Sequence, residues 1–347
     1  MPRMMRSPGV GLLLAEAPSG GLSRSVGRTL LVLFRWGVFL VACAFLCVHL
    51  TGPKGSSLLG ALADMPRPAD RWVLLGAVVA LMPVNWGIES LKWRWLMRPV
   101  EPLRPLRAFV ATLAGTSITF ITPNRTGEFV GRVLFLSPEN RVKGAFATAL
   151  GSIAQFVVTL VAGALGLAAL QMAGRSLPWP GGWTSSVLAT LTLLVAAGSL
   201  VLYFQPGLLR QLLLMVPFLH RLERASAVLH SYQRHELLLV LGLSALRYAV
   251  FTAQFVLALQ LFPSGVSVGT ALVAVPVIYL VSTLVPTILV TELGVRGSAA
   301  VGFLVPLGGQ APPVLLATFL VWAVNLVLPA LAGSIILLLA RIRTPAT

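Results

Sequence analysis

Apolar residues fill most of the chain in long runs that are separated by short charged stretches. A helix needs about 20 consecutive apolar residues to cross a bilayer. Eight runs come close to or exceed that length, at residues 29–50, 72–91, 106–121, 145–172, 184–204, 237–262, 268–290 and 312–340. The pattern therefore predicts an all-α polytopic membrane protein.

The positions of Lys and Arg test how many of these runs cross the membrane, because cytoplasmic loops carry an excess of both residues. If all eight runs cross, 12 of these residues lie inside and 9 outside. If 106–137 and 268–306 each enter and leave on one side, 17 lie inside, 4 outside and five within membrane segments. The charges thus predict six full transmembrane helices and two re-entrant helical hairpins or short helix pairs, without fixing how deep the hairpins reach.

This topology divides the chain into two similar halves of opposite orientation. Residues 29–178 and 184–342 each read as two helices, a hairpin and a third helix, with the first hairpin cytoplasmic and the second external. Inverted repeats with broken helices are the architecture of many transporters. We expect one transmembrane domain at 29–342, a disordered cytoplasmic segment at 1–28 and a cytoplasmic tail at 343–347.

Two charged segments lie at the expected tips of the hairpins, TPNRTGEFVGR and TELGVRG. Each has a Glu followed four residues later by an Arg, Glu128 with Arg132 and Glu292 with Arg296. Ionisable groups at membrane depth are costly and usually face a cavity or a partner. The two segments are therefore the main candidates for a functional site.

Local sequence around the tips favours helices that begin inside the membrane. Thr122, Pro123 and Asn124 form a helix-start pattern, and Thr291 is expected to cap the second segment. The N-terminal end of such a half-helix favours an anion. Several glycines allow close approach of a backbone or a ligand, namely Gly127, Gly131, Gly294 and Gly297.

The charges expected in the membrane core predict the nature of the ligand. Four arginines stand against Glu128 and Glu292, and Glu89 reduces the positive excess to one. Because Arg matches phosphate geometry well, a phosphate-bearing lipid head group is the expected ligand. The candidate binding residues are Arg125, Gly127, Glu128, Arg132, Arg247, Glu292, Gly294 and Arg296.

The charged and polar residues in the apolar runs could also serve the architecture alone. The Glu/Arg pairs could lock the hairpins into the bundle without a ligand. For Arg35, Glu89 and Lys92 the favoured interpretation is snorkelling toward the inner surface. A further set either lines the cavity or only links helices by hydrogen bonds, and comprises Gln155, Gln254, Asn325, Tyr279, Ser282 and Thr283.

Nothing in the sequence predicts catalysis, a metal or a cofactor. The four histidines have no metal-ligand spacing, and no nucleophile elbow, Walker motif or zinc helix is present. Cys43 and Cys47 are interpreted as packing residues. The net charge of +16 indicates topology and contact with anionic lipid, rather than nucleic acid, because most Lys and Arg flank apolar runs.

The chain resembles a known membrane protein family at TPNRTGEFVGR, at the helix with Ser152 and Gln155, and at Glu292-Leu293-Gly294-Val295-Arg296. It is similar to the lysylphosphatidylglycerol synthase transmembrane region, a flippase-like family, over residues 25 to 342. The resemblance implies a bacterial inner-membrane protein. The printed sequence ends at Thr347 without the soluble aminoacyl-transferase domain, so lysyl transfer and lysyl-lipid are not carried over.

Taken together, the sequence predicts a lipid flippase-like transporter with a central Glu/Arg site for an anionic or polyprenyl-type phosphate lipid. The alternative is a non-transporting membrane subunit that binds lipid or holds a lipid-modifying enzyme or glycosyltransferase, and a lipid-modifying enzyme is a third possibility. Membrane lipids are the expected partners, with a lipid-modifying enzyme as a further one and an oligomeric state that the sequence leaves open.

Overall fold

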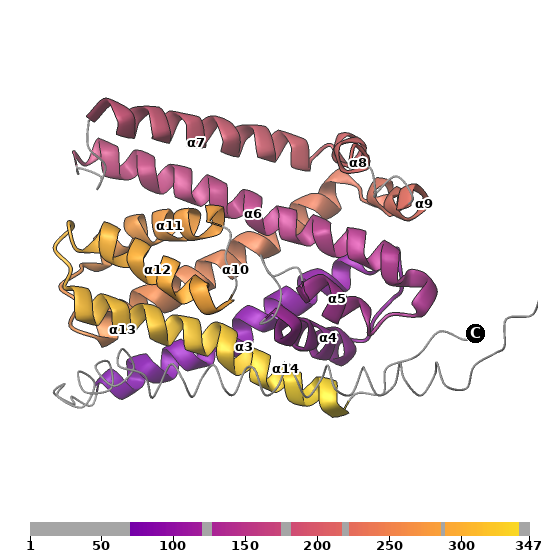
Figure 1. Ribbon diagram of the computed structural model, residues 1–347, viewed down its shortest axis with the longest axis horizontal. Helices are drawn as coiled ribbons and strands as arrows, with labels where there is room; N and C mark the ends of the chain where they lie inside the picture. The colour runs from indigo at the N-terminus through magenta and orange to yellow at the C-terminus, as the bar shows by residue number, and fades with distance from the viewer. Residues whose placement is uncertain (1–69, 120–126, 175–181, 217–221, 286–288, 340–347) are drawn as a thin grey trace, which may run out of the picture.

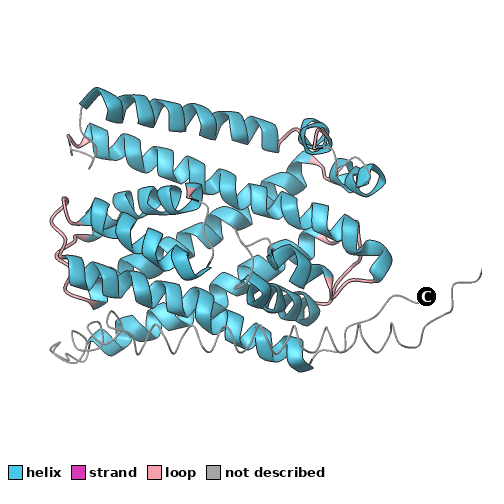
Figure 2. Ribbon diagram, viewed as in Figure 1, coloured by secondary structure: helices cyan, strands magenta, loops and turns pink. Residues whose placement is uncertain are grey.

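The computed structural model describes residues 70–119, 127–174, 182–216, 222–285 and 289–339, and every regular element in these ranges is helical (Figures 1 and 2). The first half contains α3 (Asp70–Leu96), α4 (Pro105–Ile118), α5 (Gly127–Val133), η3 (Pro138–Asn140) and α6 (Arg141–Met172). Next come α7 (Gly182–Tyr203), α8 (Pro206–Leu214), α9 (Glu223–Ser226) and η5 (Ala227–Ser231). The remainder is α10 (Arg234–Leu261), α11 (Val268–Leu284), α12 (Leu289–Leu304), α13 (Ala311–Trp322), η6 (Ala323–Val327) and α14 (Leu328–Leu339).

Five helices in the described residues are long and apolar enough to cross a membrane. They are 71–96, 138–172, 186–203, 234–261 and the continuous helix 311–339, which combines α13, η6 and α14. Each corresponds to one of the six runs predicted to cross completely. The sixth run, 29–50, lies outside the described residues. The prediction of an all-α polytopic membrane protein is therefore confirmed, while the count of six remains a prediction.

The helix α10 organises the bundle, because it runs through the middle of the molecule (Figure 1) and contacts α3, α6, α11 and α13. Its largest buried side chain, Phe255, belongs to a core that also contains Tyr279 and Leu280 of α11. A second core joins α3, α6 and α10 around Trp93, Leu150 and Leu237. The long helix α6 contributes to both cores and also packs against α11 and α5.

The short helices α4 and α5 form a pair in which the chain enters and leaves at neighbouring positions. The carboxylate of Glu101, just before α4, accepts hydrogen bonds from the Ser137 N–H at 2.8 Å and the Asn140 amide at 3.3 Å, both just after α5. Partial burial alone would raise the pKa of Glu101, but these hydrogen bonds and Arg107 lower it. The residues just before α4 and just after α5 thus lie side by side.

The helices α11 and α12 form a second pair, at the opposite end of the bundle, in which the chain also enters and leaves at neighbouring positions. The N–H of Gln310, after α12, donates to the carbonyl of Ser264, before α11, at 2.8 Å. Ser264 lies shortly after the end of α10, whereas Tyr232, shortly before its start, donates to the Leu96 carbonyl beside the first pair. The helix α10 has 28 residues and is therefore about 42 Å long. The ends of the first helix pair thus lie far from the ends of the second.

Small residues allow α4 and α5 to touch through their backbones. A Cβ added to Gly131 would lie 2.4 Å from the Cα of Gly115, and one added to Gly115 would lie 2.9 Å from the Glu128 carbonyl. The close approach predicted for Gly131 is therefore confirmed. At Gly294, however, an added Cβ meets nothing within 4 Å, so this glycine is not needed for packing. Gly297 faces only the side chain of Leu315, at 3.2 Å.

We predict that Gly131→Ala separates α4 from α5 and lowers the free energy of unfolding by about 1–3 kcal/mol, because backbone rather than a flexible side chain meets the new methyl group. The measurement is thermal or denaturant unfolding of the purified protein in detergent. Gly242→Ala in α10 is the control, since its added Cβ meets nothing within 4 Å. Equal stability of the two variants would contradict the backbone contact.

Candidate functional site

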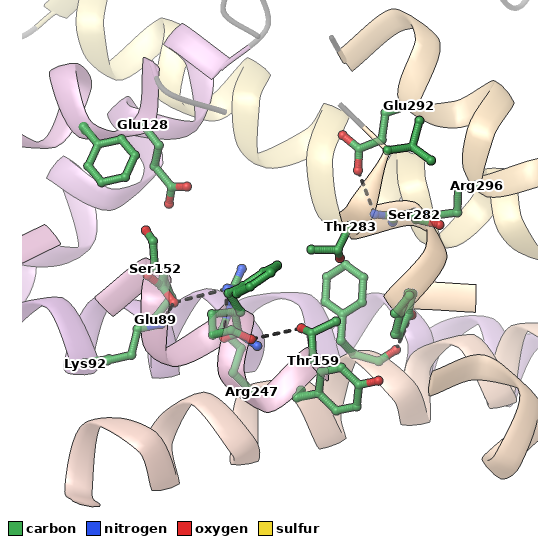
Figure 3. Close-up of a pocket in the computed structure, with 17 residues that line it drawn as sticks. Glu89, Lys92, Glu128, Ser152, Thr159, Arg247, Ser282, Thr283, Glu292 and Arg296 are labelled. Carbon is green, nitrogen blue, oxygen red and sulfur yellow. Dashed lines mark hydrogen bonds and ion pairs between the residues drawn. The ribbon is translucent and has the colours of Figure 1, made fainter. Parts of the chain in front are cut away.

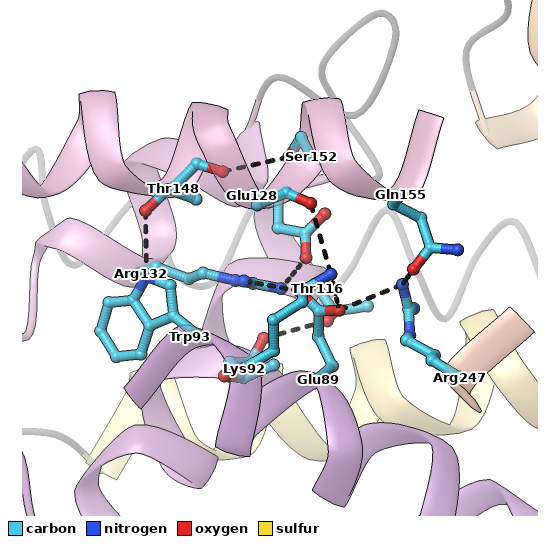
Figure 4. Close-up of polar contacts among 12 residues, drawn as sticks. Glu89, Lys92, Trp93, Thr116, Glu128, Arg132, Thr148, Ser152, Gln155 and Arg247 are labelled. Atoms are coloured by element: carbon cyan, nitrogen blue, oxygen red, sulfur yellow. Dashed lines mark hydrogen bonds and ion pairs between the residues drawn. The ribbon is translucent and has the colours of Figure 1, made fainter. Parts of the chain in front are cut away.

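One carboxylate, that of Glu89 in α3, holds three cations from three helices (Figure 4). Its Oε1 lies 2.9 Å from Nη1 of Arg132 on α5. Its Oε2 lies 2.7 Å from Nζ of Lys92 on α3 and 3.2 Å from Nη1 of Arg247 on α10. Glu89 is only 5% exposed. We call these four residues the Glu89 cluster, and it fixes the positions of α3, α5 and α10 relative to one another.

The cluster forms because each helix presents its charge at helical spacing. Glu89 and Lys92 are three residues apart on α3, and Glu128 and Arg132 are four apart on α5, so each pair shares a face. Arg132 contacts both carboxylates: its Nη1 donates a hydrogen bond to Glu89 and its Nη2 donates one to Glu128. The predicted ion pair between Glu128 and Arg132 is therefore present and is joined to a larger network.

Snorkelling is the wrong interpretation for Glu89 and Lys92. The Lys92 side chain is 2% exposed and the Glu89 side chain 6%, and each has the other as a partner at 2.7 Å. The physical reason is that α3 continues to Leu96 and packs against α10 and α4, so both charges are enclosed by protein. Arg35 lies outside the described residues.

A chain of amides orients the guanidinium group of Arg247. Its Nε donates to Oδ1 of Asn85 at 3.0 Å, and Asn85 donates in turn to Asn325 at 2.9 Å. Asn325 lies in the single π-helical turn η6, which interrupts the last spanning helix. Such turns are often found at functional sites. The Nη1 of Arg247 also contacts Oε1 of Gln155 at 3.4 Å, so this guanidinium is fixed from three directions.

The second Glu/Arg pair lies on α12, where Arg296 donates Nη2 to Oε1 of Glu292 at 2.7 Å. Both residues are 7% exposed. The guanidinium carbon lies 5.9 Å from the ring centre of Phe251 and 5.7 Å from that of Tyr279. Because α12 begins at Leu289, Thr291 lies inside the first turn rather than at the capping position expected for it.

Both groups of charges face one cavity of about 420 Å³ in the middle of the bundle (Figure 3). Glu128 of α5 lies at one side, and Glu292 with Arg296 of α12 at the other. Polar side chains complete the lining, and they come from α6, α10 and the end of α11. These residues are Ser152, Gln155, Thr159, Tyr248, Tyr279, Ser282 and Thr283. The cavity can therefore receive a polar or charged group at a depth where the surrounding helices are apolar.

The structure brings together four of the eight predicted binding residues as lining of this cavity, Glu128, Arg247, Glu292 and Arg296. Of the other four, Arg132, Gly127 and Gly294 do not line it. Arg132 is buried behind Glu128 and is joined to it by an ion pair. Gly127 is buried at the start of α5, and Gly294 is on the exposed face of α12. Arg125 and the expected cap at residues 122–124 lie outside the described residues.

Glu89 and Lys92 were not among the binding residues predicted from the sequence, yet both line the cavity. Their spacing of three residues inside an apolar helix was the available signal. Among the six ambiguous polar residues, four line the cavity and two instead link helices. Gln254 donates to the Val78 carbonyl at 2.8 Å, and Asn325 binds Asn85. No group of three metal-binding side chains occurs within the described residues.

We predict that Glu89→Gln lowers the free energy of unfolding by about 3–5 kcal/mol, because it leaves three buried cations with too little negative charge. Unfolding in detergent measures the effect. Glu223→Gln is the matched control, since Glu223 forms an exposed pair with Arg210 and its loss costs under about 1 kcal/mol. Similar losses in the two variants would show that the Glu89 cluster does not hold the helices together.

Comparison with known proteins places the whole bundle in one family. The family model described as the lysylphosphatidylglycerol synthase TM region matches residues 32–333. The search of curated proteins gave no match, and neither did the search of solved structures. The matched region contains every helix named above up to the first half of α14. The chain therefore belongs to the lysylphosphatidylglycerol synthase transmembrane region family.

Proposed function

We propose that this protein is a flippase-like transporter of a phosphate-bearing lipid across the bacterial inner membrane. The observation that carries the proposal is that charges from two oppositely placed helix pairs meet at one central cavity. Glu128 comes from α5 and Arg296 from α12, and both line it. Transporters with inverted repeats bind substrate where their broken helices meet.

The proposed topology has six full transmembrane helices and two re-entrant pairs, α4 with α5 and α11 with α12. It is supported by the hydrogen bonds that join the two ends of each pair, through Glu101 in one case and Ser264 in the other. It is also supported by the bias of 17 Lys and Arg inside against 4 outside. This arrangement puts the N- and C-termini in the cytoplasm and relates the halves 29–178 and 184–342 as inverted repeats.

A lipid is favoured over a water-soluble anion because some side chains that line the cavity, near the middle of α6, are also exposed on the outside of the bundle. Ser152 and Phe156 lie near the centre of α6, and Phe156 is 39% exposed. Val285, just after α11, is 40% exposed and also lines the cavity. A side opening at this depth leads to hydrocarbon, so acyl chains can remain in the bilayer while the head group enters.

A second candidate function is that of a non-transporting subunit that binds lipid or holds a lipid-modifying enzyme. The favouring observation is that each acidic side chain of the cavity already has a cation partner, as in the pair of Glu292 with Arg296. A site whose charges are paired internally can be rigid.

We predict that the purified protein in liposomes moves fluorescent anionic phospholipid faster than protein-free vesicles do. Glu128→Gln should change the rate about tenfold, or about 1.4 kcal/mol in the barrier, because it alters the charge that lines the cavity. Glu139→Gln in η3, a position away from the cavity, is the control. Transport is rejected if neither anionic phospholipid nor polyprenyl phosphate moves faster than in empty vesicles and Glu128→Gln changes nothing.

The topology predicts that the two returning ends face opposite compartments. In a background with Cys43 and Cys47 replaced by Ser, Lys143→Cys should react with an impermeant thiol reagent only from the cytoplasm. Gln310→Cys should react only from the periplasm. Both positions are exposed in the fold. Labelling of position 143 from the periplasm in intact cells would overturn the hairpin topology.

A further inference from the structure

The last spanning helix is held by both helix pairs. Its first segment, α13, packs against α12 of the second pair, and its last segment, α14, packs against α4 of the first pair (Figure 1). The contact with α4 is close, because an added Cβ on Gly333 would meet the carbonyl of Leu113. The Ser117 hydroxyl also donates to the Ala330 carbonyl at 2.9 Å. If the two pairs move relative to each other, as the repeats of many transporters do, this helix must bend between its two attachments.

The π-helical turn η6 lies between the two segments, at Ala323–Val327. The N–H of Leu328 bonds to the carbonyl of Ala323, five residues earlier, as in a π-helix. The sequence explains the wide turn, because Pro329 has no N–H for the carbonyl of Asn325, four residues earlier, and its ring would collide with that carbonyl in an α-helix. Helices bend sharply at prolines and at π turns. The last helix therefore has one built-in place to bend, and it lies between the attachments to the two pairs.

A chain of hydrogen bonds joins this turn to the cavity. The Nε of Arg247 donates to Oδ1 of Asn85 at 3.0 Å, and Nδ2 of Asn85 donates to Oδ1 of Asn325 at 2.9 Å. The Nδ2 of Asn325 donates at 3.1 Å to the carbonyl of Val321, one turn earlier in the same helix. The direction of every bond is fixed, because a guanidinium can only donate and a carbonyl can only accept. Both amides are fully buried, so a displacement of Arg247 leaves a buried polar group without a partner unless the turn moves as well.

Arg247 is the cation of the Glu89 cluster that can respond most readily to an occupant of the cavity. Its side chain is 14% exposed, against 2% for Lys92 and 3% for Arg132. Its Nη1 lies 3.2 Å from Glu89 and 3.4 Å from Gln155, whereas Lys92 lies 2.7 Å from Glu89. Charge-assisted hydrogen bonds are normally shorter than these two contacts. The guanidinium is thus held more loosely than its neighbours on the side that lines the cavity.

On the basis of the transport function above, we propose that η6 is the hinge on which the two helix pairs move. Asn85 and Asn325 are positioning residues that couple its bend to Arg247. When an occupant draws Arg247 into the cavity, the pull on Asn85 is relieved by a change of the turn at Asn325, and α14 swings with α4 while α13 stays with α12. The helix α14 has 12 residues and is about 18 Å long. A bend of about 20° therefore moves its far end by about 6 Å.

The hinge is tested by the distance between spin labels on α11 and α14. In a background with Cys43 and Cys47 replaced by Ser, the labels are attached at Leu272→Cys and Leu339→Cys, which are both exposed. The measurement is double electron–electron resonance of the full-length protein in liposomes of phosphatidylcholine and phosphatidylglycerol. The wild-type background should populate two conformations, and its distance distribution should be about twice as wide as that of a variant without the hinge.

Pro329→Ala is the variant without the hinge, because it supplies the N–H that the Asn325 carbonyl lacks and lets the α-helix continue. It should give a single narrow distribution. Pro313→Ala is the matched control, since this proline of the same helix is also buried but lies in the first turn of α13, where an N–H has no acceptor within the helix. Equal widths in the wild-type background and in Pro329→Ala overturn the proposal, and so does equal narrowing in the two proline variants.

The coupling is tested with Asn85→Leu, which cuts the chain of hydrogen bonds but leaves the proline in place. Arg247→Gln should change the ratio of the two conformations at least about fivefold in the wild-type background. Arg98→Gln, which removes an exposed charge outside the cavity, should not change it. In the Asn85→Leu background Arg247→Gln should have no further effect, and Asn325→Leu, which cuts the chain one bond later, should give the same result. An equal shift in all backgrounds, or no shift in the wild-type background, overturns the coupling.

Vesicle transport separates this proposal from the proposed function. If the distance measurements show the hinge and its coupling but no lipid moves, the hinge stands and the transport function fails. If lipid moves and Pro329→Ala moves it as fast as the wild-type protein does, the transport function stands and the hinge fails. The expected result is transport that Pro329→Ala slows about tenfold, or about 1.4 kcal/mol in the barrier.

Discussion

The ionic contact between Glu89 and its three cations is the interaction on which the rest of the bundle depends. Burying one carboxylate among hydrocarbon and protein is costly, and the cost is offset only when several cations and hydrogen bonds surround it. Here Lys92, Arg132 and Arg247 supply them from α3, α5 and α10. Because this one buried carboxylate contacts cations from α3, α5 and α10, the three helices are held in one arrangement.

This constraint gives the two Glu/Arg pairs different roles. Arg132 is bound by two carboxylates and lies behind the cavity wall, so its pair with Glu128 belongs to the framework. Arg296 has one carboxylate partner at 2.7 Å, and its two buried nitrogens Nε and Nη1 have no acceptor among the described residues. Two segments that look equivalent in sequence therefore differ in how much of their charge is available to a ligand.

Close backbone contact complements the ionic contact at the first helix pair. Gly131 lies against Gly115, so α5 can approach α4 closely enough for Arg132 to reach Glu89. In membranes, helices associate through packing and polar contacts because hydrocarbon provides no hydrophobic force between them. The second pair is held differently, through the aromatic residues Phe251 and Tyr279 that surround Arg296.

The sequence by itself determined the class of protein, its family and the positions of five helices long and apolar enough to span a membrane. These follow from apolar length and from Lys and Arg in loops, which are local properties of the chain. It also singled out Glu128, Arg247, Glu292 and Arg296, which line the cavity. Only the tertiary structure decided that Glu89 and Lys92 are buried partners rather than snorkelling charges, and that Gly294 faces away. The reason is that burial and pairing depend on which helices meet, and charge spacing within one helix cannot specify a contact with α5 or α10.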